Sequence, residues 1–179
     1  RIRRVEVVPF REAIRAAVAF IMTAHLLVPS LDEDKPASLS PRIVGGLLRE
    51  ELGYDGVILT DDLEMEALAR TYAAPDAAVQ AIAAGCDGVL VCRARVKDRS
   101  QDIEAQAAVI EARVHAVEDG SIPYKRVEDA LSRHRRAKER FLGDGGRGFT
   151  PHAGPKGPPY AILGCDQHRR VADEMARYV

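Results

Sequence analysis

Gly56-Val-Ile-Leu-Thr60-Asp61-Asp62-Leu-Glu-Met65 joins a short apolar run to two adjacent carboxylates. Residues 57–59 are apolar and mostly β-branched, and such a run is long enough for a buried strand but too short for a helix. In parallel α/β folds, ligands are bound at the carboxyl ends of the strands. Asp61 therefore lies where chemistry is usually done. The alternative is that Asp61 and Asp62 only cap the helix that follows.

Two further apolar runs predict strands that accompany this one. Residues 18–24 form a continuous apolar run, which is typical of a strand buried on both faces. Residues 88–92 predict a third short strand. Helical patterns follow each strand at a spacing of about 30 residues, which favours an α/β fold with parallel strands and crossover helices. Three strands cannot close a barrel, so we expect either a fragment or partner strands from elsewhere.

Capping residues and apolar spacing predict the helices. Ser40 and Pro41 form a good helix start, and Gly53 is the natural stop of the same helix. The next helix has Asp62 or Thr60 placed to cap it. Its predicted apolar side comprises Leu63, Met65 and Leu68.

Three more helices are predicted further along the chain. A small-residue helix ends at Gly85, a longer one begins at its cap Ser100 and closes at Gly120, and a last one follows Pro123. The apolar stripe predicted for the longer helix is Ile103, Ala107, Ile110, Val114 and Val117. Residues 29–40 are predicted as a loop, with the charged residues 32–35 in solvent.

The composition argues against whole classes of partner. The 179-residue chain has a formal net charge of -1, so no global charge draws it toward nucleic acid or an anionic membrane. No apolar run approaches the roughly 20 residues that span a bilayer. The basic run 133–140 alternates with Glu139 and apolar positions, which predicts a solvated helix face. His115, His134, His152 and His168 are predicted to be surface residues.

The cysteines are Cys86, Cys92 and Cys165, an odd number without paired spacing. Such a set describes neither a disulfide framework nor a zinc site. Cys86 and Cys92 flank an apolar run and are most simply small buried hydrophobic residues. These thiols favour a reducing compartment, and we expect a cytoplasmic location.

Several motifs occur in one order along the chain. They are Phe20-Ile-Met-Thr-Ala-His25, Pro36-Ala-Ser-Leu-Ser40, Leu47-Leu-Arg-Glu-Glu-Leu-Gly-Tyr-Asp-Gly56, Thr60-Asp-Asp-Leu-Glu-Met65 and Ala84-Gly-Cys-Asp87. Together they resemble family 3 glycoside hydrolases, and among these the bacterial β-N-acetylhexosaminidases that act on peptidoglycan fragments. The resemblance extends from about Pro9 to Phe141. Several motifs in the correct order are more specific than any one of them.

This resemblance implies a (β/α)8 TIM-type barrel, of which the chain would hold the last three β/α units. It also implies that Asp61 is the catalytic nucleophile, which forms a glycosyl-enzyme with retention of configuration. Asp62 would be a supporting residue that caps the helix or accepts a hydrogen bond. The expected partner is a carbohydrate, derived from peptidoglycan, and no cofactor or metal is expected.

The chain departs from the family pattern in one respect. The family's acid/base loop, with a Lys-His pair and an Asp-X-His dyad, has no counterpart here, so we expect it upstream of Arg1 and the chain to be a partial sequence. His25 imitates that loop, but no aspartate stands two residues before it. We interpret His25 as a strand-end histidine that lines the sugar pocket; the alternative is a structural histidine held by hydrogen bonds.

The predicted organisation has three parts. Residues 1–142 form the C-terminal portion of a barrel domain, residues 143–159 a Gly/Pro-rich linker, and residues 160–179 a terminal helical segment of unknown role. Two rival functions stay open. One is a binding or interaction module without catalysis, and the other is a metal-dependent hydrolase that uses His25, Asp61 and Asp62 as ligands.

Overall fold

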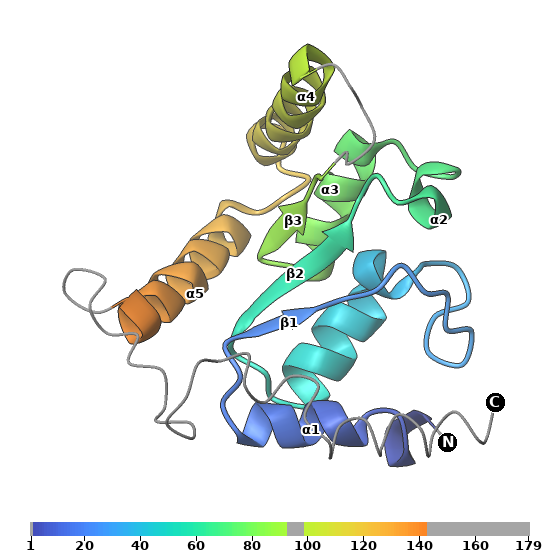
Figure 1. Ribbon diagram of the computed structural model, residues 1–179, viewed down its shortest axis with the longest axis vertical. Coiled ribbons are helices and arrows are strands. Elements are labelled where there is room, and N and C mark those ends of the chain that lie inside the picture. The colour runs from blue at the N-terminus through green and yellow to red at the C-terminus, as the bar shows by residue number, and fades with distance from the viewer. Residues whose placement is uncertain (1, 93–98, 143–179) are drawn as a thin grey trace, which may run out of the picture. The chain divides into compact units, whose positions relative to one another are not determined.

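The computed structural model describes residues 2–92 and 99–142 (Figure 1). The predicted linker 143–159 and the terminal segment 160–179 lie outside the described residues. So do Cys165, His152, His168 and the side chain of Ser100, the predicted helix cap. Within the part of the chain that is described, no helix is both long enough and apolar enough to cross a membrane.

Three parallel strands form the sheet, in the order β1-β2-β3 (Figure 1). Their bounds are Phe20–Met22 for β1, Val57–Asp62 for β2 and Gly88–Leu90 for β3. Phe20 pairs with Val57 and Met22 with Leu59. The register between β2 and β3 shifts between Leu59 and Asp62. The predicted α/β class and the parallel strands are confirmed, and three such strands are consistent with part of a barrel.

Helical segments connect the strands. In chain order they are η1 Ile2–Arg4, α1 Val8–Arg15, η2 Ala37–Leu39, η3 Arg42–Glu51, α2 Glu66–Ala69, α3 Ala74–Ala84, α4 Arg99–Glu118 and α5 Tyr124–Leu142. Because β1 and β2 are parallel, the chain must run back to the end of the sheet at which both strands begin. Helix η3 lies in this connection. Helix α3 makes the return from β2 to β3.

Helix η3 begins and ends where the sequence predicts. The Ser40 hydroxyl accepts a hydrogen bond from the Ile43 amide at 3.1 Å. Gly53 has a φ of +67°, the left-handed conformation that glycine adopts at helix ends. The helix is of the π type, and at its end the Leu52 amide reaches five residues back to the Leu47 carbonyl at 3.0 Å.

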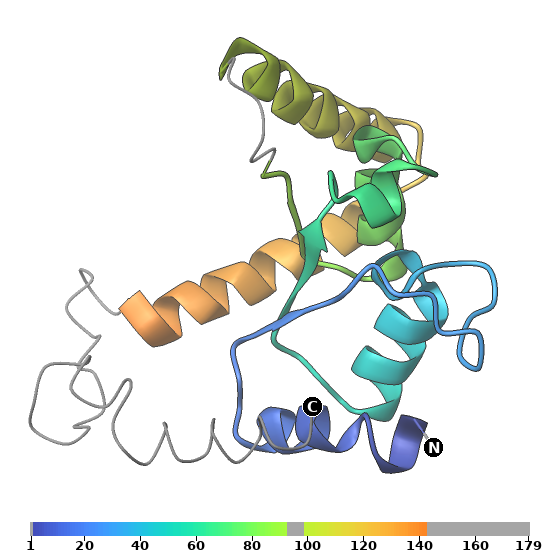
Figure 2. The ribbon, with the colours of Figure 1, turned by 45° about the vertical axis from the view of Figure 1, so that its right-hand side comes forward.

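Helices η3 and α3 pack against one face of the sheet and bury the core (Figure 2). Ile21 and Ile58 point into this core from the strands. Small side chains let α3 approach closely, because Ala77, Ala78 and Ala81 are fully buried. This face of the sheet is therefore the packed one.

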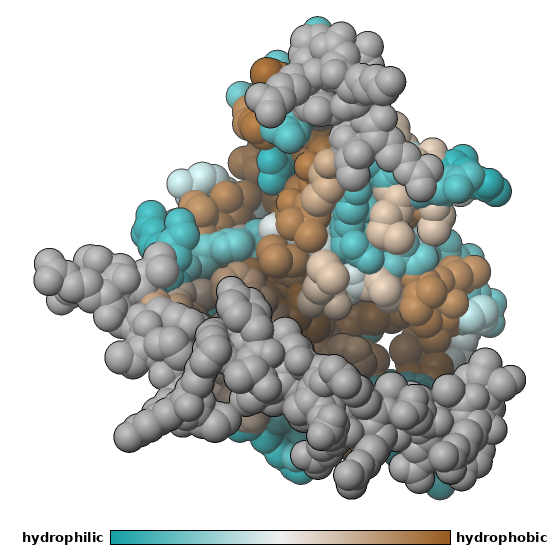
Figure 3. Space-filling model, in the orientation of Figure 1, coloured by the Kyte–Doolittle hydropathy of each residue, from teal (hydrophilic) through white to brown (hydrophobic). Residues whose placement is uncertain are grey.

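The opposite face of β1 is exposed, which corrects the prediction for residues 18–24. Phe20 is 46% exposed and Met22 57%, whereas Ile21 between them is 8% exposed. Side chains alternate along a strand, and the described helices cover only the Ile21 side. Hydrophobic side chains accordingly show at the surface in the middle of Figure 3, where β1 and β2 lie in Figure 1.

Helix α4 buries the predicted stripe only in part: Ala107 and Val117 are partly buried, and Val117 packs against the buried cluster that contains Ala116. Ile103, Ile110 and Val114 are exposed, and the buried positions are Val109 and Ala116. The two buried residues are seven apart, so they lie on one line of the helix, and they pack with the core residues of α3. The apolar spacing predicted the helix correctly, but it did not predict which apolar side of the helix packs against α3.

Two local predictions are also wrong. Cys86 is buried as predicted, but Cys92 is exposed, because β3 ends at Leu90 and the chain has left the core by then. Asp32 was predicted in solvent and is 5% exposed. Its carboxylate accepts the Ser40 hydroxyl at 2.5 Å and the amides of Asp34 and Lys35, so it organises the loop from inside. The Ser40 hydroxyl bond is the main reason that the pKa of Asp32 is lowered.

Candidate active site

Asp61 lies at the carboxyl end of the central strand. Its amide donates to the Thr23 carbonyl at 3.0 Å, and the Thr23 amide donates to the Leu59 carbonyl at 2.8 Å. This parallel ladder is regular up to Asp61, so Asp61 shares a face with Leu59 and Met22. Asp61 therefore belongs to the face of the sheet that the described helices leave uncovered.

The carboxylate of Asp61 is only lightly engaged. Oδ1 accepts the amide of Asp62 at 2.8 Å, and the side chain is half-buried. Among the described side chains, no ion pair within 4.0 Å involves Asp61. A carboxylate at a strand end with no neutralising cation is free to act as a nucleophile or a base.

Asp62 does not cap the next helix, which corrects one of the predictions for it. Its Oδ1 accepts the amides of Glu64 at 3.1 Å and Cys92 at 3.0 Å, so it ties the end of β2 to the segment after β3. Helix α2 begins later, at Glu66, and no side chain caps it. The hydrogen-bonding role predicted as the alternative for Asp62 matches this geometry.

Thr60 does not cap α2 either. Its hydroxyl accepts the Leu90 amide at 3.1 Å and so replaces a ladder bond at the register shift between β2 and β3. The predicted apolar side of α2 is also incomplete. Leu63 and Leu68 are buried, but Met65 is 42% exposed, because a turn separates Leu63 from the helix.

His25 reaches the same strand end from the loop after β1. Its Nε2 lies 2.9 Å from the Asp62 carbonyl oxygen, and its Nδ1 lies 2.7 Å from the Ser38 hydroxyl. A carbonyl can only accept, so Nε2 carries a proton, and in the neutral form of the ring Nδ1 then accepts the Ser38 hydroxyl. Both ring nitrogens thus have protein partners. The predicted contact of His25 with a sugar stays a prediction.

This arrangement does not favour the metal-dependent alternative. The described residues contain no group of three or more His, Cys, Asp or Glu side chains placed to hold a metal ion. His25 would have to give up one of its two hydrogen bonds to become a ligand. Asp62 Oδ1 is likewise occupied by two amides.

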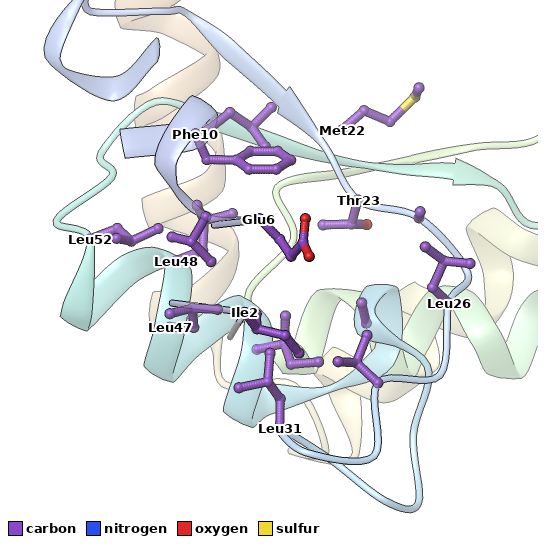
Figure 4. A pocket seen from close by; sticks show the side chains of 16 residues that line it. Ile2, Glu6, Phe10, Met22, Thr23, Leu26, Leu31, Leu47, Leu48 and Leu52 are labelled. Atoms are coloured by element: carbon purple, nitrogen blue, oxygen red, sulfur yellow. The ribbon is translucent and has the colours of Figure 1, made fainter. Parts of the chain in front are cut away.

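An apolar cavity of about 380 Å³ lies on the helix side of β1 (Figure 4). Phe10, Leu26, Leu31 and Leu47 are among its lining residues. Glu6 and Thr23 are its only polar lining residues within the described chain. Such a lining leaves sugar hydroxyls without hydrogen-bond partners, so the cavity is not the candidate active site.

The opposite, amino-terminal end of the strands holds a cluster that the sequence did not reveal. The carboxylate of Asp87 is completely buried. Arg126 contacts it at 2.7 Å and Arg133 at 3.3 Å; Arg49 also forms an ion pair with it. The Ile58 amide donates to it at 2.9 Å. A buried carboxylate that arginines neutralise at the amino-terminal end of the strands serves stability rather than catalysis.

Two predictions on α5 are corrected by this cluster. Arg133 was placed on a solvated face, but its side chain is 19% exposed and turns toward Asp87. His134 was predicted at the surface, but it is half-buried and its Nε2 lies 3.1 Å from the Asp87 carbonyl. A charged run hides such inward residues, because only the fold decides which helix face meets the sheet.

Comparisons with known proteins place the chain in a family. The model described as the glycosyl hydrolase family 3 N terminal domain matches residues 1–137. A β-hexosaminidase of Bordetella pertussis is 43% identical over 94 residues, which cover 51% of this chain and 26% of that protein. One from Methylobacillus flagellatus is 38% identical over 112 residues, covering 59% of this chain and 32% of that protein.

A solved structure agrees with these sequences. The family 3 β-N-acetylglucosaminidase from Paenibacillus sp. str. FPU-7 superposes with a TM-score of 0.70 and 43% identity, over 77% of this chain and 25% of that one. The chain belongs to glycosyl hydrolase family 3. It spans a third or less of the length of these relatives.

Proposed function

We propose that the chain supplies the catalytic nucleophile, Asp61, of a family 3 β-N-acetylhexosaminidase. One observation carries the proposal: Asp61 is a half-buried carboxylate at the carboxyl end of the central strand, and no cation among the described side chains neutralises it. Membership of the family and the relatives named β-hexosaminidase support this assignment. We further propose that β1, β2 and β3 are the last strands of a (β/α)8 barrel.

The chemistry assigned to Asp61 is a double displacement. A carboxylate oxygen of Asp61 attacks the anomeric carbon, and the bond from that carbon to the leaving oxygen breaks as a general acid protonates the oxygen. Water then gives a proton to that same group, which now acts as a base, and attacks the anomeric carbon of the glycosyl ester; this releases Asp61 with net retention of configuration. The acid/base group is expected outside the residues described here.

We propose terminal β-linked N-acetylglucosamine of peptidoglycan-derived muropeptides as the substrate. The motifs that resemble the peptidoglycan-acting subfamily support this choice, as does the β-N-acetylglucosaminidase activity named for the Paenibacillus structure. We propose the cytoplasm as the location. The free thiols of Cys86 and Cys92 among the described residues are in keeping with a reducing compartment.

The first test asks whether the chain needs the rest of a barrel. The isolated 179-residue chain should not turn over an aryl β-N-acetylglucosaminide above background. A complete-barrel protein, in which residues 9–141 replace the matching segment of the Paenibacillus enzyme, should turn it over at about 1 per second or faster. Turnover at that rate by the isolated chain would contradict the expectation of a partial barrel.

The second test identifies the nucleophile in the complete-barrel protein. A slow fluoro-sugar substrate should leave its glycosyl group on the peptide that contains Asp61, as found by mass spectrometry after digestion. Label on Asp62 or Glu64 would move the nucleophile by one or three residues. An active protein that never becomes labelled would overturn the retaining mechanism.

A further inference from the structure

We propose that His25 is a positioning residue for Asp61: it holds the backbone directly after Asp61 through the Asp62 carbonyl, which belongs to the Asp62–Leu63 peptide, and is itself held by Ser38. This inference rests on the proposed function, because it concerns the orientation of the carboxylate of the proposed nucleophile. It assigns His25 a task different from contact with the sugar.

The first step is the fixed direction of the His25 ring. The Asp62 carbonyl accepts from Nε2 at 2.9 Å, and this bond determines which nitrogen carries the proton. The remaining nitrogen, Nδ1, accepts the Ser38 hydroxyl at 2.7 Å. With both ends of the ring engaged, its rotation about the Cβ–Cγ bond would break both hydrogen bonds.

The second step is the anchoring of Ser38. This residue is completely buried, and its carbonyl oxygen lies 3.6 Å from the Cys86 sulfur at the start of the third strand segment. Asp32 holds the same loop from inside through the Ser40 hydroxyl at 2.5 Å. The partner of His25 is therefore part of the core rather than of a solvent-exposed loop tip.

The third step is that the remaining groups around Asp61 are held from other directions. Its amide donates to the Thr23 carbonyl at 3.0 Å. The Asp62 carboxylate accepts the Cys92 amide at 3.0 Å. Hydrogen bonds from β1, from the loop after it and from the segment after β3 thus converge on residues 61 and 62. Among the described residues, His25 provides the only one of these bonds that runs from an ionisable side chain to a backbone carbonyl.

The consequence is pre-organisation of the Asp61 carboxylate. A nucleophile must be held close to its attack position, and a displacement of about 1 Å can cost about 100-fold in rate. Asp61 has no ion pair among the described side chains that could aim it, so its backbone must do so. Loss of the His25 bond would free the Asp62 carbonyl and let the Asp62–Leu63 peptide rotate, which loosens the backbone next to Asp61.

The kinetic test uses two amides that differ in reach. In the complete-barrel protein, His25→Gln should keep most of the activity, because the Gln amide nitrogen can occupy the position of Nε2. His25→Asn reaches only the position of Nδ1 and should lower kcat about 100-fold, with KM nearly unchanged. Ser38→Ala should give a smaller loss of kcat. Equal losses in the Gln and Asn variants, or a rise in KM with kcat kept, would overturn the positioning role.

A second measurement does not depend on activity. The ring nitrogens of His25 in the 179-residue chain can be read by ¹⁵N NMR at about pH 8.5, where a histidine ring is neutral. A fixed ring with the proton on Nε2 is expected, and Ser38→Ala should shift the Nδ1 signal. The same chain unfolded in urea serves as the control and should show averaged tautomers.

The two proposals fail in different ways. A His25 ring with the proton on Nδ1, or averaged as in the unfolded chain, would overturn the positioning role even if Asp61 is labelled by the fluoro-sugar. Absence of label on Asp61 in an active protein would overturn the nucleophile, although the NMR result could still show the ring held as described.

Discussion

Asp61 and Asp87 lie at opposite ends of the same parallel sheet, and their surroundings differ as sharply as two aspartates can. The Asp87 carboxylate is completely buried and contacts three arginines and the Ile58 amide. The Asp61 carboxylate is half-buried and accepts the amide of its own neighbour Asp62. Asp61 is one of the last two residues of β2 and Asp87 directly precedes β3, so proximity to a strand end alone does not separate them.

The difference shows how one chemical group serves two purposes. A buried charge is tolerated when it is paired and its oxygens are satisfied, and Asp87 meets this condition on both oxygens. A nucleophile instead needs an accessible lone pair and a charge that no cation neutralises. Asp61 meets this second condition among the described side chains. The Asp87 carboxylate, whose oxygens are both hydrogen-bonded or ion-paired, stabilises the fold. The Asp61 carboxylate, which no described cation neutralises, is available for chemistry.

The largest expected effect on activity comes from removing the negative charge of Asp61. In the complete-barrel protein, Asp61→Asn should lower kcat by several orders of magnitude, because the amide matches the shape of the carboxylate but cannot attack as a carboxylate. The melting temperature should change little, since Asp61 takes part in no ion pair among the described residues.

Asp62→Asn is the matched control for this prediction. It removes a charge one residue away and leaves an oxygen that can still accept the Cys92 amide. Its loss of kcat should be much smaller. Substantial activity in Asp61→Asn together with a severe loss in Asp62→Asn would contradict the proposal and indicate that Asp62 is the nucleophile.

The next largest effect concerns stability rather than rate. Asp87→Ala should lower the free energy of unfolding of the 179-residue chain by about 3–5 kcal/mol, because it leaves several arginines near one another without their shared carboxylate. Arg49 is affected most, since burial already lowers its pKa and Asp87 opposes that shift. Urea denaturation measures the loss.

Asp55→Asn provides the comparison for that measurement. Asp55 also pairs with Arg133, at 3.1 Å, and with Arg136, at 2.8 Å, but its side chain is 72% exposed. An exposed pair contributes about 1 kcal/mol or less. Similar losses for Asp87→Ala and Asp55→Asn would mean that the buried cluster is not what holds this end of the sheet together.

The sequence predicts the local elements of this fold better than their packing. Ser40 and Gly53 set the ends of η3 through a hydroxyl and a left-handed backbone, both of which are local properties. The exposure of Phe20 and the inward turn of Val109 depend instead on which neighbours the described chain provides. No spacing rule within one segment contains that information.

The candidate site divides in the same way. Asp61 could be found from its position after a buried strand and from the order of the motifs. The partners of His25 could not, because Ser38 and the Asp62 carbonyl are 13 and 37 residues away along the chain. Arg133 was hidden for a related reason: in a run of basic residues, only the fold shows which one reaches Asp87.

The smallest expected effect uses two cysteines as reporters at the two ends. Cys86 is next to Asp87, and its pKa is raised to about 12, first by burial and then by the charge of Asp87. At about pH 8 it is almost entirely protonated, so it should not react with iodoacetamide in the folded chain. Cys92 is exposed and should react, although its pKa is also raised, by burial first and then by the charges of Asp62, Asp61 and Glu64.

Cys92 therefore reports on the carboxylate charges at the carboxyl end of β2, among them that of Asp61. A thiol whose pKa is raised by a nearby carboxylate forms more thiolate when that charge is removed. Asp61→Asn takes away one charge and no hydrogen bond to Cys92, so it should speed the alkylation of Cys92 by a fewfold at most and leave Cys86 unreactive. Peptide mass spectrometry over time gives both rates separately. An unchanged Cys92 rate in a chain whose Cys86 stays protected would show that the charge of Asp61 does not act on Cys92, which would contradict the electrostatic coupling expected at the carboxyl end of the sheet.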